Sequence, residues 1–243
     1  MLTAVISDIH SNLQALEAVL AAIDAEGVDE IWCLGDLVGY GADPGPCVEI
    51  LRERTKICLA GNHDLAAIGS IPTDVFTQGA AAAAAWTTEA LEPEQRSWLA
   101  SLKPEGERAG AGLYHGSPRD PVWEYVLSSL AAEMCLDDAG RPFVLVGHSH
   151  VALAFSRRPG QPATGETQRA GTVLDLRGAE WIINPGSVGQ PRDGDPRAAW
   201  LLLDLTDGRC EFRREDYDIQ AAQSAIRTAG LPESLADRLR LGV

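Results

Sequence analysis

Short apolar runs alternate with helix-like patterns over the first part of the chain. Leu2–Ser7 is apolar and rich in β-forming residues, and a polar loop follows it. From Leu13 to Ile23, apolar residues recur at the spacing of one helical face, and Gly27 is placed to end that helix. Residues 1–27 therefore predict a strand, a loop and a helix.

The same alternation continues to residue 60. Glu30–Leu34 and Ile57–Ala60 are predicted to be the second and third strands, and Pro44–Lys56 the helix between them. Strands that alternate with helices in this way form a parallel sheet through right-handed crossovers. We therefore expect a βαβαβ unit at the start of the chain.

The rest of the chain contains more strands and fewer helices. Residues 74–102 are predicted to be helical, with a new helix starting at Pro93. The segment 158–171, rich in Gly, Pro, Thr and Gln, is expected to be a surface loop. Further strands are expected at 112–115, 143–146, 151–156, 173–176, 180–183, 200–205 and 210–214, and helices near 127–136 and at 232–241. No shift in composition and no repeat marks a boundary, so the sequence favours one α/β domain over residues 1–243.

The acidic charge of the chain limits the kinds of molecule that it is expected to bind. The 243 residues carry a formal net charge of −15. Binding to nucleic acid relies on Lys and Arg side chains that displace counterions from phosphate, so this balance argues against nucleic acid as a partner. An anionic substrate would need a local reversal of sign, which metal ions can supply.

Cysteine usage and hydropathy bear on location. The five cysteines are scattered and include no Cys-x-x-Cys pair, which is typical of buried thiols in a reducing compartment. Asp8 and His10 interrupt the first apolar stretch, so no signal peptide is predicted. No apolar run reaches the ~20 residues of a membrane span. We therefore expect a cytoplasmic protein without a membrane partner.

All five histidines follow apolar β runs. His10, His63, His115, His148 and His150 each lie at or just beyond the end of a predicted strand, beside Gly, Asp, Asn or Ser. In parallel α/β sheets, ligands bind at this carboxyl edge. One histidine at a strand end is more often an ordinary loop residue, but five in such positions indicate a shared site.

The spacing of these residues is typical of metal ligands. Asp8 and His10 are separated by one residue, and so are His148 and His150. In an extended segment, the side chains of such a pair project to the same side, so each pair is expected to converge on one point. Imidazole nitrogen and carboxylate oxygen suit Zn, Fe or Mn, and no cysteine accompanies them as in a structural zinc site.

The candidate ligands are too many for one ion. Asp36 closes the second strand at the same sheet edge, and Asn62 after the third strand adds a neutral oxygen. The full set is Asp8, His10, Asp36, Asn62, His115, His148 and His150. Since a carboxylate has two oxygens, seven ligands suit two ions that share Asp36. Two-metal sites of this kind promote in-line phosphoryl displacement.

Together these segments resemble the ordered motif set of the calcineurin-like metallophosphoesterases. The matching segments, in chain order, are Asp8-x-His10, Gly35-Asp36, Gly61-Asn62-His63-Asp64, His115 and Gly147-His148-Ser149-His150. The later segment Asn184–Arg192 is similar to one in bacterial members, the small phosphodiesterase type. The resemblance therefore extends from residue 8 to residue 192.

The resemblance implies a four-layer αββα sandwich with two divalent ions, Mn, Fe, Zn, Mg or Ni, at the sheet edges. One ion would take Asp8, His10, Asp36 and His150, and the other Asp36, Asn62, His115 and His148. A hydroxide bridging the ions would attack phosphorus in line. His63, as an imidazolium, would protonate the departing oxygen and so act with Asp36 in catalysis.

One segment departs from the pattern of the Ser/Thr protein phosphatases in this superfamily. Gly39 and Tyr40 stand where those enzymes have Asp and Arg. In them, the Asp orients the leaving-group histidine and the Arg binds phosphate. The departure therefore argues against a protein phosphatase, and it requires Asp64 or another group to orient His63.

A few further side chains are candidates to contact the substrate. Arg192 lies beyond the Asn184–Gly189 loop and joins Asn62 and His63 as a predicted substrate-binding residue, with a solvated surface position as the alternative. Further candidates, for which surface exposure or simple packing is the alternative, are Arg119, Arg197, Trp123 and Tyr125.

The sequence as a whole predicts a two-metal hydrolase of small phosphate esters. The expected activity is that of a small-molecule or nucleotide phosphodiesterase or phosphatase, and a hydrolase of nucleotide or dinucleotide polyphosphates stays open. The acidic balance disfavours a DNA nuclease. The remaining alternative is a non-catalytic protein-interaction module on the same fold, which the complete ligand set disfavours. The sequence predicts neither the native substrate nor the oligomeric state.

Overall fold

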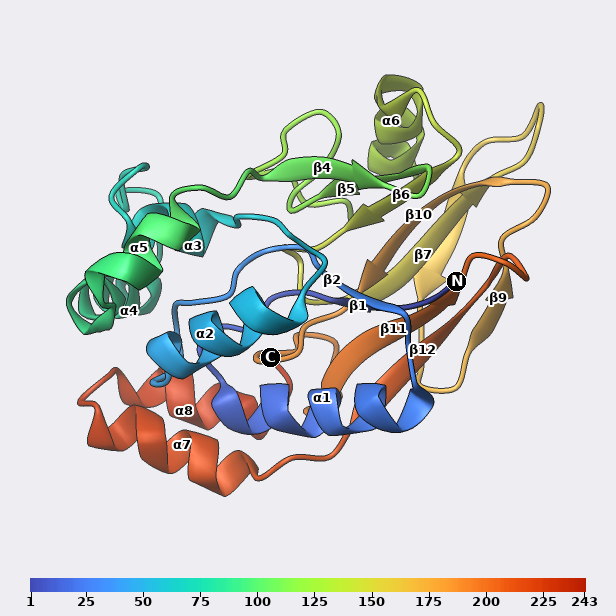
Figure 1. Cartoon of the computed structure of the whole chain (residues 1–243). Coiled ribbons are helices and arrows are strands. Elements are labelled where there is room, and N and C mark those ends of the chain that lie inside the picture. The colour runs from blue at the N-terminus through green and yellow to red at the C-terminus, as the bar shows by residue number, and fades with distance from the viewer.

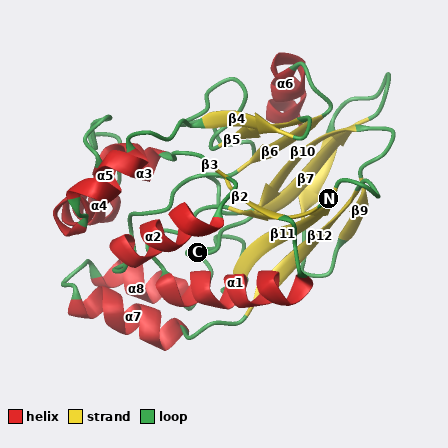
Figure 2. Ribbon diagram, viewed as in Figure 1, coloured by secondary structure: helices red, strands yellow, loops and turns green.

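Two six-stranded sheets pack face to face in the middle of the molecule, and helices cover their outer faces (Figures 1 and 2). The structure is a computed structural model that describes all 243 residues. The arrangement is the four-layer αββα sandwich, so the predicted fold class is confirmed.

The first sheet contains the predicted βαβαβ unit. Its strand order is β3-β2-β1-β11-β12-β9. The bounds are β1 (Leu2–Ile6), β2 (Glu30–Cys33), β3 (Ile57–Cys58), β9 (Val173–Asp175), β11 (Ala198–Asp204) and β12 (Arg209–Glu215). Strands β1, β2 and β3 are parallel, as predicted, whereas β11 joins β1 antiparallel and makes the sheet mixed.

The second sheet has the order β4-β5-β6-β10-β7-β8. The bounds are β4 (Glu105–Arg108), β5 (Ala111–Tyr114), β6 (Phe143–Val146), β7 (Ala152–Arg157), β8 (Thr164–Thr167) and β10 (Glu180–Pro185). Strand β8 corrects the prediction of a continuous loop over 158–171. It is a fully exposed edge strand that pairs only with β7, so its side chains carry no apolar alternation that would reveal it.

The helices are placed on both outer faces and at one end of the sandwich (Figure 1). Helices α1, α2, α7 and α8 lie beyond the first sheet, α6 lies beyond the second, and α3, α4 and α5 cluster at one end. The bounds are α1 (Leu13–Glu26), α2 (Pro44–Arg54), α3 (Asn62–Ala67), α4 (Gln78–Ala90), α5 (Pro93–Leu99), α6 (Ser129–Ala139), α7 (Ile219–Thr228) and α8 (Glu233–Leu239). None of these helices combines the length and the apolar composition that crossing a bilayer requires.

The central strands are apolar on both sides because each faces two cores. In β1, Ala4 and Ile6 pack under α1 and α2, while Val5 faces the second sheet. In β6, Leu145 belongs to the core between the sheets, and Val144 packs in the core that includes α6. Burial on both faces makes these strands rigid supports for the loops that leave their carboxyl ends.

Candidate metal centre

The loops that follow β1, β2 and β6 have an unusual backbone. Five candidate ligands have left-handed φ angles: 56° for Asp8, 50° for His10, 53° for Asp36, 64° for His148 and 60° for His150. Non-glycine residues rarely adopt this region. Such strain costs ~1–3 kcal/mol per residue and persists where the surrounding structure enforces it, most often at functional sites.

Hydrogen bonds from the backbone hold these loops against one another. The backbone N–H groups of Asp8 and His10 donate to the carbonyls of Gly35 and Asp36, each at 3.0 Å. The backbone N–H of His148 donates to the carboxylate of Asp8, 3.2 Å from each oxygen. These bonds join loops of both sheets into one frame.

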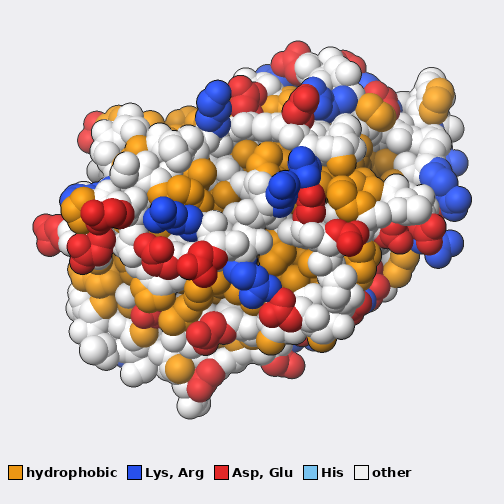
Figure 3. All heavy atoms as spheres, viewed as in Figure 1, with side chains coloured by type: hydrophobic (Ala, Val, Ile, Leu, Met, Phe, Trp, Pro, Cys, Tyr) orange, Lys and Arg blue, Asp and Glu red, His pale blue; other side chains and the backbone are white.

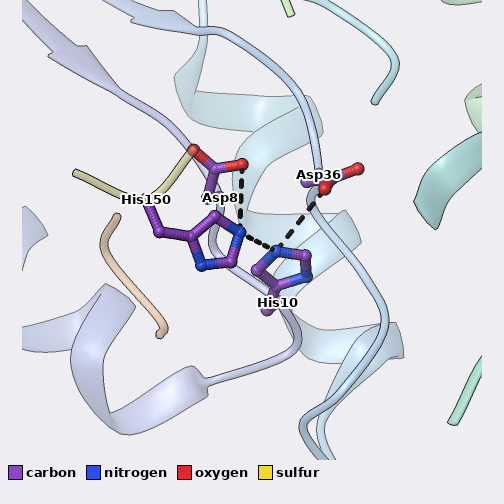
Figure 4. A group of neighbouring side chains, drawn as sticks. All are labelled: Asp8, His10, Asp36 and His150. Atoms are coloured by element: carbon purple, nitrogen blue, oxygen red, sulfur yellow. Dashed lines mark hydrogen bonds and ion pairs between the residues drawn. The ribbon is translucent and has the colours of Figure 1, made fainter. Parts of the chain in front are cut away.

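Four side chains form a first cluster, shown in Figure 4. One ligand atom each from Asp8, His10, Asp36 and His150 lies within 4.8 Å of the others. Nε2 of His10 is 3.5 Å from Oδ2 of Asp36, and Nε2 of His150 is 3.6 Å from Oδ1 of Asp8. Asp8 and His10 thus converge on one point, although their backbone is left-handed and not extended.

The tautomers in this cluster leave a place for a cation. Nδ1 of His10 donates to the carbonyl of Val38 at 3.0 Å, and Nδ1 of His150 donates to that of Gln190 at 2.6 Å. With Nδ1 protonated in both neutral rings, the two Nε2 lone pairs face each other at 3.0 Å (Figure 4). That contact is repulsive alone and favourable around a metal ion.

A second cluster lies beside the first. It contains Asp36, His115 and His148, and Asn62 adjoins it. Nδ1 of His115 donates to the carbonyl of Leu34 at 3.0 Å, so its Nε2 lone pair faces the Asn62 oxygen at 3.1 Å, another contact between two acceptors. Nε2 of His148 is buried without any hydrogen-bond partner. These unpaired acceptors also suit a cation.

Asp36 is the residue that the two clusters share. Its Oδ2 lies 3.5 Å from Nε2 of His10 and 3.5 Å from Nε2 of His115. Its Oδ1 accepts a hydrogen bond from the backbone N–H of His63 at 2.8 Å. Gly61 packs so closely that a Cβ there would overlap this carboxylate. The carboxylate is therefore held with one oxygen between both sets of donors.

His148 and His150 do not converge on one point, which corrects the interpretation of their spacing. His150 belongs to the first cluster and His148 to the second. The interpretation assumed an extended segment, but all four residues of the two pairs have left-handed φ angles, so the spacing alone decides neither case. The pair thus serves two neighbouring groups of ligands.

Burial shifts the pKa values in the direction that removes charge. It raises the pKa of Asp36 to about 8 and lowers those of His115 to about 4 and His148 to about 2. The pKa of Asp8 also rises well above its ordinary value, through burial and then through the charge of Asp36. All five histidines are buried, and none is visible on the face in Figure 3. Without a cation, the site therefore resists ionisation.

Metal stabilisation is expected to increase with pH. Asp36 must lose its proton to bind a cation, and its pKa of about 8 keeps it protonated in mildly acidic solution. The rise in unfolding temperature caused by 1 mM Mn²⁺, roughly a saturating concentration, should therefore be larger at pH 8 than at pH 6. Differential scanning calorimetry at both pH values measures it, with Na⁺ at matched ionic strength as control.

The metal-free protein should respond to pH in the opposite sense. A folded-state pKa of about 8, above the ordinary value of 3.8, means that the folded chain binds more protons than the unfolded chain between these limits. The contribution of Asp36 to stability is therefore lost as pH rises from about 4 to about 8.

The two pH effects can be told apart by the Mn²⁺ measurement. A rise in unfolding temperature with Mn²⁺ that is the same at pH 6 and pH 8, or smaller at pH 8, would contradict the assignment of Asp36 as a ligand.

His63 is held by rings rather than by a carboxylate. Its ring centroid lies 4.9 Å from that of His10, 4.4 Å from that of Tyr40 and 4.8 Å from that of Phe76. Its Nδ1 is buried without a hydrogen-bond partner. The packing of aromatic side chains thus fixes the ring plane, while Nδ1 carries no charged partner.

Asp64 does not orient His63. One oxygen of its buried carboxylate accepts from the backbone N–H groups of Leu37 at 2.9 Å and Val38 at 3.1 Å. The other accepts from the N–H of Gly61 at 2.8 Å. Asp64 therefore positions the loop that carries Asp36 and not the ring of His63.

Gly39 provides the space that His63 occupies. A Cβ at Gly39 would lie 2.5 Å from Nδ1 of His63, so Gly39→Ala is expected to displace the ring. Displacement of a catalytic group by about 1 Å costs about 100-fold in rate. With an ester whose leaving oxygen is strongly basic, such as diphenyl phosphate, the rate of G39A should fall by up to about this factor. Gly69→Ala is the control, because Gly69 also has a positive φ, 74°, but no neighbour within 4 Å.

Both alanine variants should lose ~1–2 kcal/mol of stability from the left-handed backbone. Urea unfolding measures this loss of stability. Activity is measured at 20 °C, so that a lower rate in G39A than in G69A reports displacement of the His63 ring and not backbone strain. Equal activity in G39A and G69A would show that the position of His63 does not depend on this contact.

A cavity of about 320 Å³ opens beside the clusters and contains Arg192. The guanidinium lies 3.3 Å from the hydroxyl of Tyr40 and 5.7 Å from the centre of that ring, and it donates to Gln190 at 3.0 Å. Tyr40, which stands where related enzymes have an arginine, thus supports an arginine from another loop. Arg192 thus lines one cavity with Asn62 and His63, the other two residues predicted to bind the substrate.

The other candidates divide between the surface and the cavity. Arg119 pairs with Glu124 at 3.2 Å, and Arg197 pairs with Asp195 at 2.7 Å, and neither lines the cavity. Trp123 and Tyr125 do line it. The ring of Tyr125 is stacked on that of His148, with centroids 4.2 Å apart.

Sequence reasoning missed five residues that line this cavity, which are Val75, Phe76, Thr77, Ala80 and Arg238. Phe76, before α4, packs on His63, and Arg238 reaches the cavity from α8. Arg238 lies one residue before the buried Leu239, and an arginine beside the apolar face of a helix is a weak signal. No pattern near Phe76 points to the site.

Comparisons with known proteins agree with this geometry. A family model described as a calcineurin-like phosphoesterase superfamily domain matches residues 1–208. An uncharacterised protein of Methanocaldococcus jannaschii is 39% identical over 246 residues, which cover 98% of this chain and 97% of that protein. The crystal structure of a metallophosphoesterase from Sphaerobacter thermophilus is 42% identical, with a TM-score of 0.90 and coverage of 100% and 99%. A hypothetical protein from Pyrococcus horikoshii, 21% identical, shares the fold with a TM-score of 0.81 and coverage of 100% and 98%.

Proposed function

The chain belongs to the calcineurin-like phosphoesterase superfamily, and on that premise we propose that it hydrolyses small phosphate esters with two divalent metal ions. The observation that carries the proposal is Oδ2 of Asp36, 3.5 Å from Nε2 of both His10 and His115. We assign one ion to Asp8, His10, Asp36 and His150, and the other to Asp36, Asn62, His115 and His148.

The donor chemistry fits such ions. Imidazole nitrogens and carboxylate oxygens suit Mn, Fe, Zn, Mg or Ni to different degrees. The Nε2 atoms of His10 and His150 face each other without a proton between them, and Nε2 of His148 has no partner. When bound, the ions would lower the pKa of water and neutralise charge on the phosphoryl oxygens.

Two side chains of the cavity have proposed roles toward the ester. Arg192, held on Tyr40 and Gln190, would bind an anionic oxygen of the substrate. His63 would donate a proton from Nε2 to the leaving oxygen, since its Nδ1 is buried against Gly39. Burial and the charge of Arg192 lower the pKa of His63 in the free protein, and the negative charge of a bound ester acts in the opposite direction.

Hydrolysis of bis(p-nitrophenyl) phosphate and p-nitrophenyl phosphate tests this function. The purified chain, loaded in turn with Mn²⁺, Fe²⁺, Zn²⁺, Mg²⁺ or Ni²⁺, is expected to release nitrophenolate and to stop after chelation by EDTA. A comparison of monoesters, diesters and dinucleotides then defines the preferred substrate. Absence of turnover with every metal and ester would overturn the proposal in favour of a non-catalytic interaction module.

A further inference from the structure

Two arginines share the cavity, and neither forms an ion pair with a side-chain carboxylate. Arg192, from the loop after β10, and Arg238, from α8, both line the cavity of about 320 Å³ that contains Asp36. Nε of Arg192 is buried without a hydrogen-bond partner. Nε of Arg238 donates to the backbone oxygen of Val243 at 2.6 Å, and no side-chain carboxylate forms an ion pair with either arginine.

The absence of an acidic partner is unexpected in this chain. Acidic residues outnumber Lys and Arg by 35 to 20, so neutralising groups are plentiful. Asp193, the residue next to Arg192, forms its ion pair with Arg214 instead. Burial, and after it the charge of Arg192, lowers the pKa of Arg238. Such a pair is complementary to an anion.

The charge that surrounds the clusters indicates more than one anionic group. In the proposed function, on which this inference rests, two divalent ions, the carboxylates of Asp8 and Asp36 and the attacking hydroxide leave a net charge of +1, which suits one phosphate group. Arg192 adds a positive charge without an acidic partner, and Arg238 adds further guanidinium donors beyond its bond to Val243. The cavity is also several times larger than one phosphate group. The charge of the site and the volume of the cavity therefore both suit a second phosphate group.

We propose that Arg192 and Arg238 bind a second phosphate group of the substrate, next to the group held at the ligand clusters. Guanidinium groups match phosphate oxygens with paired hydrogen bonds. Phe76, Trp123 and Tyr125 line other parts of the same cavity, which suits an organic group rather than an inorganic polyphosphate. The substrate class is therefore an organic di- or polyphosphate.

A pair of ligands that differ by one phosphonate tests the proposal. Binding of methylphosphonate and methylenediphosphonate is measured by isothermal titration calorimetry on the Mn²⁺-loaded chain, at fixed free Mn²⁺. In the parent protein, the Kd of methylenediphosphonate should be about tenfold or more below that of methylphosphonate. In Arg238→Gln, the ratio of the two Kd values should fall to about threefold or less. Arg240→Gln is the matched control, because Arg240 is exposed, lies two residues away and does not line the cavity.

The outcomes are separable. If the two phosphonates bind the parent protein equally tightly, or if R238Q keeps the parent ratio of Kd values, the proposed second phosphate site is wrong. If R238Q does not fold, Arg238→Lys replaces it, and an intermediate ratio of Kd values supports the role of the guanidinium. Hydrolysis of bis(p-nitrophenyl) phosphate by the same preparation reports on the proposed function separately. An inactive parent that keeps the difference between the two Kd values would overturn hydrolysis and still support the second phosphate site.

Discussion

Replacement of Asp36 by asparagine is expected to lower kcat/KM for bis(p-nitrophenyl) phosphate by about 1000-fold or more. Asparagine keeps the shape of the side chain and an oxygen that can accept from the N–H of His63. It loses the charge and the second carboxylate oxygen, which lies between His10 and His115. Initial rates in saturating Mn²⁺ measure the loss, and elemental analysis should show fewer bound ions per chain than in the parent protein.

Asp43→Asn is the matched control for this substitution. Asp43 is a half-buried aspartate just before α2, and it belongs to neither ligand cluster. Its variant should bind metal like the parent protein and keep rates within about twofold, as substitutions away from specific interactions usually do. A D36N protein that bound the parent complement of metal at parent rates would remove Asp36 from its proposed place between two ions.

The layers were predictable because the central strands have strong local patterns. Strand β1 is apolar on both faces, and the helices between β1, β2 and β3 have clear apolar periodicity. The elements missed are β4, α3 and α7. Strand β4 reads Glu-Gly-Glu-Arg at a sheet edge, so its structure depends on a partner strand that local periodicity cannot reveal. Helix α3 is short and directly follows β3, whereas the apolar periodicity of α7 does indicate a helix and was overlooked.

The candidate ligands could be picked out because they lie in short motifs directly after strands, and the structure brings them together in two clusters. What the sequence could not reveal depends on backbone geometry and on long-range packing. The assignment of His148 and His150 to different clusters depends on how their loop is placed against the other loops, which the spacing alone does not specify. The approach of Arg238 to Tyr40 joins the C-terminal helix to a loop near residue 40 and has no local signal.

The two departures from the protein-phosphatase pattern have a joint structural explanation. Gly39 leaves the space that Nδ1 of His63 occupies, so a side chain there is excluded rather than simply absent. Tyr40 packs on His63 and also supports the guanidinium of Arg192. In the loop after β2, the Ser/Thr protein phosphatases have a carboxylate and an arginine. In this chain, the ring of Tyr40 contacts His63 in place of the carboxylate, and the arginine comes from the loop after β10.

Replacement of His63 by glutamine is expected to slow hydrolysis in a way that depends on the leaving group. A proton donor matters most when the departing oxygen is strongly basic, and its loss then costs about 100- to 10,000-fold. Diphenyl phosphate should therefore lose about 100-fold or more in kcat/KM, and bis(p-nitrophenyl) phosphate about tenfold or less. Parallel rate measurements on both esters give the ratio.

Metal content distinguishes this variant from D36N. Because the His63 side chain belongs to neither ligand cluster, H63Q should keep the parent complement of metal. The displaced ring in G39A should produce the same dependence on the leaving group in milder form, since the donor is present but misplaced. Equal losses on both esters would show that His63 positions the substrate through its contacts with Tyr40 and Phe76 and does not transfer the proton.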